Sequence, residues 1–145
     1  MKLSKEFNNG IIIFIGISVY FALMNILGFS NVFYLRFFNV FFVFYGVNKT
    51  VQMNLAEGNK GFVSNAISAL ITSLVGVFLS IIGLIIYSYI KGGDAYVQSL
   101  SKTFLFGGNP SVMTYSICLL FEGIASSVIV TLLVMLYYNK QYPAD

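Results

Sequence analysis

Four long apolar segments limit what this chain can fold into more than any other feature of its sequence. They cover residues 10–29, 31–47, 62–90 and 111–138. A helix needs about 20 mostly apolar residues to cross the hydrocarbon core of a bilayer. A lone strand in lipid would leave its backbone polar groups unsatisfied. The segments therefore predict an all-α integral membrane protein, with four transmembrane helices packed as one antiparallel bundle over residues 1–145.

The charge content supports this class and excludes others. Charged residues make up 9% of the chain, whereas a soluble domain has about 25%. The chain has no His and a single Cys, Cys118, so an internal disulfide is impossible and a zinc site is improbable. The net charge of +3 comes from scattered lysines, which form no basic patch for nucleic acid. We expect no cofactor and no metal, and the lipid bilayer as the main partner.

The lysines also predict an orientation, because cytoplasmic loops of membrane proteins carry an excess of Lys and Arg. One predicted side holds Lys2, Lys5, Lys49, Lys60 and Lys140, and the other holds Lys91 and Lys102. This distribution predicts that both termini are cytoplasmic, in a multi-pass protein of the plasma membrane.

The connection between the third and fourth segments predicts a short amphipathic helix over residues 94–106. Apolar residues recur within it at helical spacing, at Tyr96 or Val97, Leu100 and Phe104. Asp94 is a candidate N-cap. We interpret this helix as lying on the outer membrane surface. A lid or a docking helix for a partner is the alternative.

Small residues recur at every fourth position along the third segment. They are Ser64, Ser68, Thr72, Gly76 and Ser80. The fourth segment has small residues of its own, at Gly123, Ser127 and Thr131. Small side chains let membrane helices approach closely, and hydroxyl groups can hydrogen-bond across the contact. We predict that the third and fourth segments cross through these residues. A contact with a second protomer or a different subunit is the alternative.

Apart from Tyr and Cys118, Arg36 and Glu122 are the ionisable residues well inside the predicted spans. A charge at the bilayer centre costs roughly 2.5 to 3.5 kcal/mol even on the lenient insertion scale. Asn39 follows Arg36 by one helical turn, and Asn25 lies near the outer end of the first segment. We predict that these four residues form an intramembrane polar cluster in which Arg36 pairs with Glu122.

Two alternatives to this ion pair remain open. In one, Arg36 extends to the membrane surface, while Glu122 is protonated. In the other, Glu122 titrates as part of a transport or proton pathway.

Parts of the sequence resemble a known family. "LRFFNVFFVFYGVNK", then "GFVSNAISALITSLVGVFLSIIGLIIYSYI", and finally "FEGIASSVIVTLLVMLYYNK" are similar to domain of unknown function 4199, a bacterial family of small four-span membrane proteins. The resemblance covers most of the chain, from the first segment to Lys140. It implies a bacterial inner-membrane protein and draws attention to Arg36, Asn39, Glu122 and Gly123. It supplies no activity.

Two functions fit these features. The first is a non-enzymatic membrane protein that serves as a scaffold or accessory subunit, alone or with other membrane subunits, because loops are short and ionisable chemistry is scarce. The alternative is a small oligomeric transporter or channel that uses Glu122 and Arg36. An enzyme is disfavoured, since the sequence shows no nucleophile–base constellation, no carboxylate pair and no phosphate-binding glycine loop.

Overall fold

The computed structural model describes residues 2–29, 32–100 and 109–143. In these residues the chain is all-α, as predicted. Its long helices are α1 (Lys2–Leu27), α2 (Asn39–Ala56), α3 (Phe62–Ile90) and α5 (Val112–Tyr137). Shorter elements are α4 (Asp94–Leu100) and the 3-10 helices η1 (Phe33–Phe38) and η2 (Asn139–Gln141).

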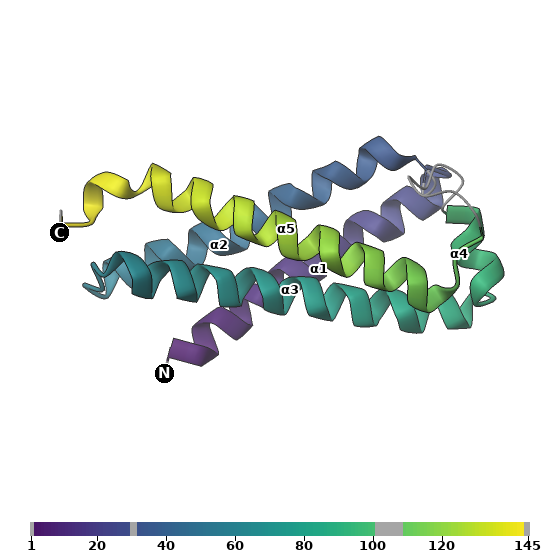
Figure 1. Ribbon diagram of the computed structural model, residues 1–145, viewed down its shortest axis with the longest axis horizontal. Helices are drawn as coiled ribbons and strands as arrows, with labels where there is room; N and C mark the ends of the chain where they lie inside the picture. Colours follow the sequence, from purple (N-terminus) through teal and green to yellow (C-terminus); the bar gives the residue numbers. More distant parts are fainter. Residues whose placement is uncertain (1, 30–31, 101–108, 144–145) are drawn as a thin grey trace.

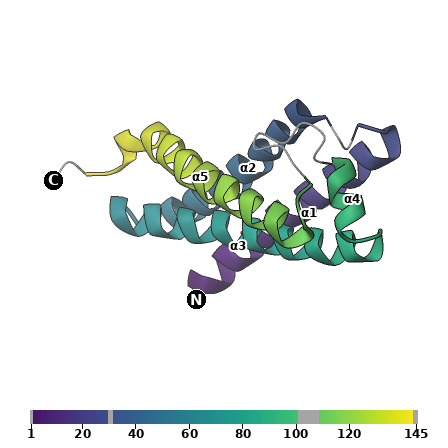
Figure 2. The same ribbon diagram turned by 45° about the vertical axis from the view of Figure 1, so that its right-hand side comes forward.

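The long helices pack along one another (Figure 1). Both termini lie toward the end that holds the α2–α3 turn, which we call the terminal end. The opposite end holds α4, seen clearly in Figure 2, and we call it the α4 end. Helices α2 and α3 each contact all of the other long helices. Side chains of α2 and α3 therefore have the most opportunity to connect different parts of the fold.

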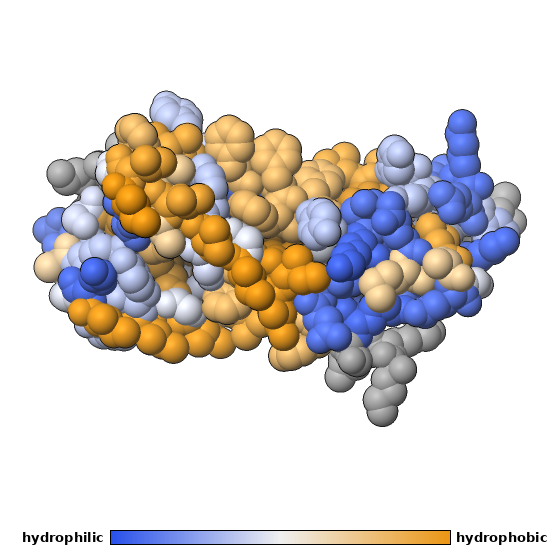
Figure 3. All heavy atoms as spheres, turned by 180° about the vertical axis from the view of Figure 1, so that it is seen from behind, coloured by the Kyte–Doolittle hydropathy of each residue, from blue (hydrophilic) through white to orange (hydrophobic). Residues whose placement is uncertain are grey.

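Three of the described helical segments are long and apolar enough to cross a membrane. They are Lys5–Leu27, Phe62–Ile90 and Val112–Tyr137. Apolar side chains cover the middle of the molecule in Figure 3, and hydrophilic ones gather toward the terminal end. These features indicate a membrane protein. Helix α2 is not among the three segments, because its second half is rich in polar residues.

Two helices extend beyond the predicted membrane-spanning segments. The first segment was predicted to start at residue 10, but α1 begins at Lys2. The second was predicted to end at residue 47, but α2 continues to Ala56. In both cases the helix continues through polar sequence in which some side chains, such as Asn9 and Thr50, are buried against neighbouring helices. Tertiary contacts therefore extend these helices beyond their apolar stretches.

The fourth segment begins close to its predicted position. Helix α5 starts at Val112, and Ser111 is its N-cap. The Ser111 hydroxyl accepts a hydrogen bond from the backbone N–H of Thr114 at 3.1 Å. This bond satisfies one of the N–H groups that the first turn of a helix leaves without a partner.

Asp94 caps a different helix from the one predicted. It is the first residue of α4 rather than the residue before it. Its Oδ1 atom accepts a hydrogen bond from the backbone N–H of Val112 at 2.8 Å. That N–H belongs to the first residue of α5, where a carboxylate also interacts favourably with the helix dipole. Asp94 thus joins the start of α4 to the start of α5.

Helix α4 packs on protein rather than presenting its apolar face to lipid. Val97 is fully buried and Leu100 is 7% exposed. Both belong to a cluster with Val112 and Tyr115 of α5. The surface-lying interpretation is therefore wrong for these two side chains, because α5 and its neighbours already cover them. The remainder of the predicted helix, including Phe104, lies outside the described residues.

The small residues of α3 contact α1 and α2, not α5 as predicted. A Cβ atom built at Gly76 would lie 2.6 Å from Ile13 Cγ2 and 3.2 Å from the carbonyl oxygen of Gly10, both on α1. Helix α5 meets the neighbouring face of α3, where a Cβ built at Gly123 would lie 2.5 Å from Val77 Cγ1. The row of small residues at every fourth position of α3, which we call the strip, is about 100° away from Val77 around the helix. Helices α1 and α5 therefore pack on two adjacent faces of α3.

Two residues of the strip, Ser64 and Ser80, form only local hydrogen bonds among those described and none to another helix. Ser64 is exposed and accepts a hydrogen bond from Asn59 in the α2–α3 turn. Ser80 donates to the carbonyl oxygen of Gly76 in its own helix at 2.7 Å. A four-residue spacing alone could not distinguish these positions from the central ones.

Candidate functional site

Polar side chains gather in two places, and the first is near the α4 end. Arg36 lies in η1, and its Nη1 donates a hydrogen bond to the hydroxyl of Tyr115 at 2.8 Å. Its Nη2 lies 3.7 Å from Glu122 Oε2. The structure therefore brings Arg36 and Glu122 together as an ion pair and adds Tyr115 as a third member.

The sequence analysis overlooked Tyr115, although its spacing contained the signal. Tyr115 and Glu122 are seven residues apart on α5. Residues with this separation lie two turns apart on the same helix face. A search for polar groups on the Glu122 face would have found this hydroxyl.

The Arg36–Glu122 pair lies at the surface of the molecule. The Glu122 side chain is 49% exposed and that of Arg36 is 25% exposed. Glu122 is ten residues into α5, or about 15 Å from the start of the helix. Its neighbours Phe121 and Ile129 are exposed apolar residues. A half-exposed carboxylate thus occupies the middle of an apolar helix that is able to cross a membrane.

Asn39 and Asn25 are in different surroundings from the ion pair. Asn39 starts α2, and its buried Oδ1 atom has no hydrogen-bond partner in the described structure. Asn25 of α1 donates to the hydroxyl of Tyr87 of α3 at 3.5 Å. Neither amide forms one of the hydrogen bonds of Arg36 or Glu122 described above. Of the predicted four-residue cluster, the structure thus shows the Arg36–Glu122 ion pair, while Asn25 contacts Tyr87.

A group of tyrosines surrounds Asn25 at the α4 end. The rings of Tyr87 and Tyr96 meet edge-on with centroids 5.7 Å apart. Phe21 of α1 packs edge-on against the other side of Tyr87. Burial raises the pKa of the Tyr96 hydroxyl above its ordinary value. Because Tyr96 belongs to α4 and Tyr87 to α3, their ring contact joins the short helix to α3.

The second polar group is a buried network near the terminal end, and the sequence analysis missed it. Asn9 of α1 donates to the hydroxyl of Thr50 of α2 at 2.9 Å. That hydroxyl lies 2.8 Å from the hydroxyl of Thr72 of α3. The Thr72 hydroxyl in turn donates to the carbonyl oxygen of Ser68 at 3.0 Å. One chain of hydrogen bonds therefore joins α1, α2 and α3.

Glu6 is the acidic member of this region. Its side chain is 4% exposed and accepts a hydrogen bond from the Ser68 hydroxyl. The preceding residue, Lys5, forms an ion pair with Glu57 at 2.6 Å. Buried polar groups that are hydrogen-bonded in this way specify how helices fit together. The network fixes the positions of α1, α2 and α3 at the terminal end.

The network was not predicted because the first apolar segment was taken to begin at residue 10. Their spacing nevertheless carried a signal. Residues Lys5, Glu6, Asn9 and Ile13 are buried along α1, at intervals typical of one helix face. Reading that periodicity backwards from the apolar stretch would have placed Glu6 inside the fold.

The remaining predicted packing residue, Ser127, lies on α5. It is fully buried, and its hydroxyl has no hydrogen-bond partner in the described structure. Cys118 is a free thiol of intermediate burial. Within the described ranges, no three His, Cys, Asp or Glu side chains lie close enough to hold a metal ion.

Comparison of the sequence and the structure with protein families, with curated proteins and with solved structures gave no match. The resemblance to domain of unknown function 4199 therefore stays a prediction. The geometry of the two polar regions is the basis for any functional conclusion.

Proposed function

We propose that this protein is a non-enzymatic subunit of a membrane assembly in a bacterial inner membrane. The partner would cover the surface that contains Arg36 and Glu122. In this proposal the chain crosses the membrane four times as an antiparallel bundle, with both termini in the cytoplasm. The family resemblance agrees with this description but adds no activity to it.

The observation that carries the proposal is the exposure of the Glu122 carboxylate halfway along α5. Lipid solvates neither member of an ion pair, and polar groups at this depth normally face protein or water. In the isolated chain 49% of the Glu122 side chain is uncovered. A partner helix with a hydrogen-bond donor would remove this surface from lipid and give the carboxylate a second polar neighbour.

The geometry supports an assembly subunit better than a transporter. A transport site would place the carboxylate in a water-filled passage between helices. Here the ion pair lies on the outside of the helices, beside exposed apolar residues of α5. Two polar side chains that lie between helices, Thr50 and Thr72, form a hydrogen bond with one another.

In this proposal, η1 and the first half of α2 together form the fourth membrane crossing. Phe33–Phe38 and the residues that follow it form one nearly continuous helical stretch through Gly46. Many of its side chains are large and apolar, and Phe37, Phe38 and Phe41 are exposed. Exposed aromatic side chains of this kind are suited to contact with lipid.

Cross-linking in native membranes tests the proposal. A photoreactive amino acid at Ala125 would sit one turn from Glu122 on the exposed face of α5. The matched control carries it at Ile82, an exposed residue in the second half of α3. We expect the Ala125 variant to form a larger cross-linked species, whose second component is identified by mass spectrometry, and the Ile82 variant to form little of it.

Loss of the Ala125 product in a Glu122→Gln background would connect the contact to the carboxylate. A protein that is monomeric in mild detergent and forms no adduct from Ala125 would contradict the proposal. In that case proton flux into proteoliposomes, compared between the parent and Glu122→Gln, would test the transport alternative directly.

The topology has its own test, which does not depend on a partner. Single cysteines at Ser99 and Asn139, both exposed, would be introduced after Cys118→Ser. We expect a membrane-impermeant reagent applied from outside to label position 99 and not position 139. Equal labelling of both positions would refute the orientation.

A further inference from the structure

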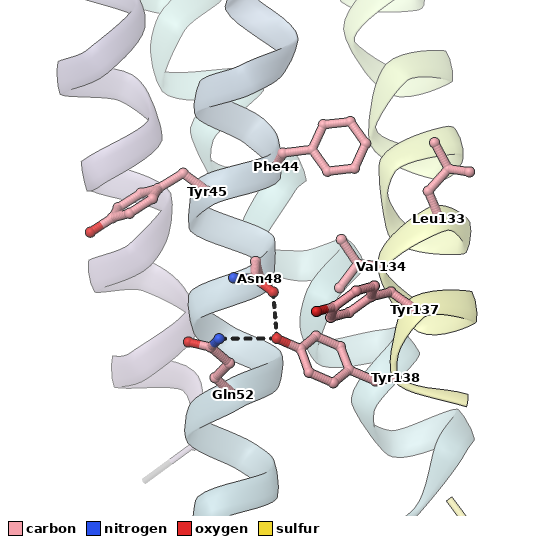
Figure 4. Close-up of a pocket in the computed structure, with 8 residues that line it drawn as sticks. All are labelled: Phe44, Tyr45, Asn48, Gln52, Leu133, Val134, Tyr137 and Tyr138. Carbon is pink, nitrogen blue, oxygen red and sulfur yellow. Dashed lines mark hydrogen bonds between the residues drawn. The ribbon is translucent and has the colours of Figure 1, made fainter. Parts of the chain in front are cut away.

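A groove runs between α2 and α5 toward the terminal end and is separate from both polar regions described above. Its volume is about 500 Å³. The residues that line it are Phe44, Tyr45, Asn48, Gln52, Leu133, Val134, Tyr137 and Tyr138 (Figure 4). This volume is in the range of pockets that hold small organic ligands, about 300 to 1,000 Å³.

The groove is apolar in one part and polar in the other. Phe44 and Leu133 lie together in one part, whereas Gln52 and Tyr138 lie at the opposite end (Figure 4). Along α2 the order from Phe44 through Asn48 to Gln52 advances by one turn at each step. The lining therefore changes from hydrocarbon to amide and hydroxyl over about 12 Å of helix.

Hydrogen bonds hold the polar end in one arrangement. The Tyr138 hydroxyl accepts a hydrogen bond from Gln52 Nε2 at 3.0 Å and donates one to Asn48 Oδ1 at 2.7 Å. Because its oxygen is engaged, the Asn48 amide presents its Nδ2 hydrogens away from Tyr138 (Figure 4). An amide nitrogen in this position is a donor for an oxygen of a bound molecule.

The groove lies where a membrane surface would be. Leu133 and Val134 belong to the last turns of the apolar segment Val112–Tyr137, and Tyr138 follows directly after it. Tyr45 and Tyr137, at the edges of the groove, are 59% and 78% exposed. Tyrosines are enriched at the level of lipid headgroups. The apolar part of the groove therefore points toward the bilayer and the polar part toward water.

Two lysines are close in sequence to residues that line the polar end. Lys49 follows Asn48 directly and is one turn beyond Tyr45, on the same side of α2. Lys140 lies in η2, two residues after Tyr138. Among the described residues neither lysine takes part in an ion pair, whereas Lys5 is paired with Glu57. An anionic group at this end would meet positive charge together with the Asn48 donor.

We propose that this groove binds an anionic phospholipid. One acyl chain occupies the apolar part between Phe44 and Leu133. The phosphate lies at the polar end, where it accepts a hydrogen bond from Asn48 and interacts with Lys49. A lipid matches both ends of the groove and is supplied by the surrounding membrane, whereas free phosphate would leave the apolar part uncovered.

Native mass spectrometry of the full-length protein in mild detergent tests this assignment. Phosphatidylglycerol and phosphatidylcholine with identical acyl chains would be titrated separately. A lysine near an anionic headgroup contributes about 1 kcal/mol, which corresponds to about a fivefold difference in binding. We expect phosphatidylglycerol to bind at least about fivefold more tightly than phosphatidylcholine. Equal binding of the two lipids would overturn the anionic assignment.

Two pairs of variants place the lipid in the groove. Leu133→Trp would fill the apolar part, and its control is Leu132→Trp, on the adjacent exposed residue outside the groove. Lys49→Gln would remove the charge at the polar end, and its control is Lys60→Gln in the α2–α3 turn. We expect Leu133→Trp to abolish the phosphatidylglycerol adduct and Lys49→Gln to weaken it about fivefold, with both controls unchanged.

Each other outcome overturns the proposal. Phosphatidylglycerol that binds Leu133→Trp as it binds the parent protein does not occupy the groove. If Leu133→Trp does not fold, the Lys49→Gln and Lys60→Gln pair decides, and equal affinities of these two variants refute the site. Displacement of the lipid by an equal concentration of inorganic phosphate would assign the polar end to free phosphate instead.

Discussion

Gly76→Ala tests how closely α1 and α3 approach. The new Cβ would lie 2.6 Å from Ile13 Cγ2 and 2.7 Å from Ile13 Cβ, whereas carbon atoms in contact are about 3.5 to 4.0 Å apart. The two helices must therefore separate by roughly 1 Å at a point where the Gly10 backbone is also in contact. Overpacking of this kind costs about 1 to 3 kcal/mol, and alanine regains at most about 1 kcal/mol of helix propensity.

The matched control is Gly83→Ala, two turns farther along the same helix. A Cβ at Gly83 would lie 3.1 Å from the ring of Phe14, and the end of that ring can move. We expect Gly83→Ala to be neutral or stabilising and Gly76→Ala to be destabilising, so the two should differ by about 2 kcal/mol. This difference corresponds to about 4 to 8 °C in melting temperature.

The assay is thermal unfolding in detergent, followed as the fraction of monodisperse protein after heating. A double-mutant cycle with Ile13→Ala adds a second test, because the shorter side chain makes room for the Cβ at Gly76. We expect the double variant to be more stable than the sum of the two single changes predicts, by at least about 0.5 kcal/mol. Equal melting temperatures for Gly76→Ala and Gly83→Ala would refute the close approach.

Three further changes have expected outcomes in the same thermal assay. Asp94→Ala removes a carboxylate that caps α5 and should lower stability by about 1 kcal/mol, and an unchanged melting temperature would show that the cap contributes nothing. Ser68→Ala removes the donor from the buried Glu6 and should cost about 1 to 3 kcal/mol, whereas Ser64→Ala on the exposed part of α3 should be close to neutral. Burial raises the pKa of Tyr96, so the folded state retains this proton more strongly than the unfolded state does. The stability that comes from keeping Tyr96 protonated in the folded state is complete below pH about 10 and decreases as the pH rises further. Tyr96→Phe should therefore weaken the alkaline loss of stability, and identical pH profiles for the two proteins would contradict this role.

Helix type and approximate position could be predicted from the sequence because hydrophobicity determines both. The third segment was predicted at 62–90, and α3 has those bounds. The fourth differs by one residue at each end. Both are long, mostly apolar stretches bounded by polar or glycine-containing turns, so their ends are marked in the sequence. The start of α1 and the end of α2 could not be predicted in this way, because polar residues there are buried by other helices rather than exposed in loops.

The sequence indicated which face of a helix is packed more readily than it indicated which other helix packs there. The spacing of Ser68, Thr72 and Gly76 correctly indicated a close helix contact. It could not indicate which helix makes that contact, since α1 and α5 both offer small residues at Gly10 and Gly123. The choice depends on the whole arrangement, in which α3 presents one face to α1 and the adjacent face to α5. A periodicity in one helix contains no information about that arrangement.

Two acidic residues, Glu6 and Glu122, show why sequence position is a poor guide to burial. Glu122 lies at the centre of an apolar segment, yet nearly half of its side chain is uncovered. Glu6 lies in a polar stretch beside the N-terminus, yet it is 4% exposed. The difference follows from the helix faces, because Glu6 of α1 contacts Ser68 of α3, whereas Glu122 of α5 contacts Arg36 and is half exposed. The acid buried within the chain already has a hydrogen-bond donor from a neighbouring helix. The acid at the surface is paired with Arg36, and about half of its side chain stays uncovered.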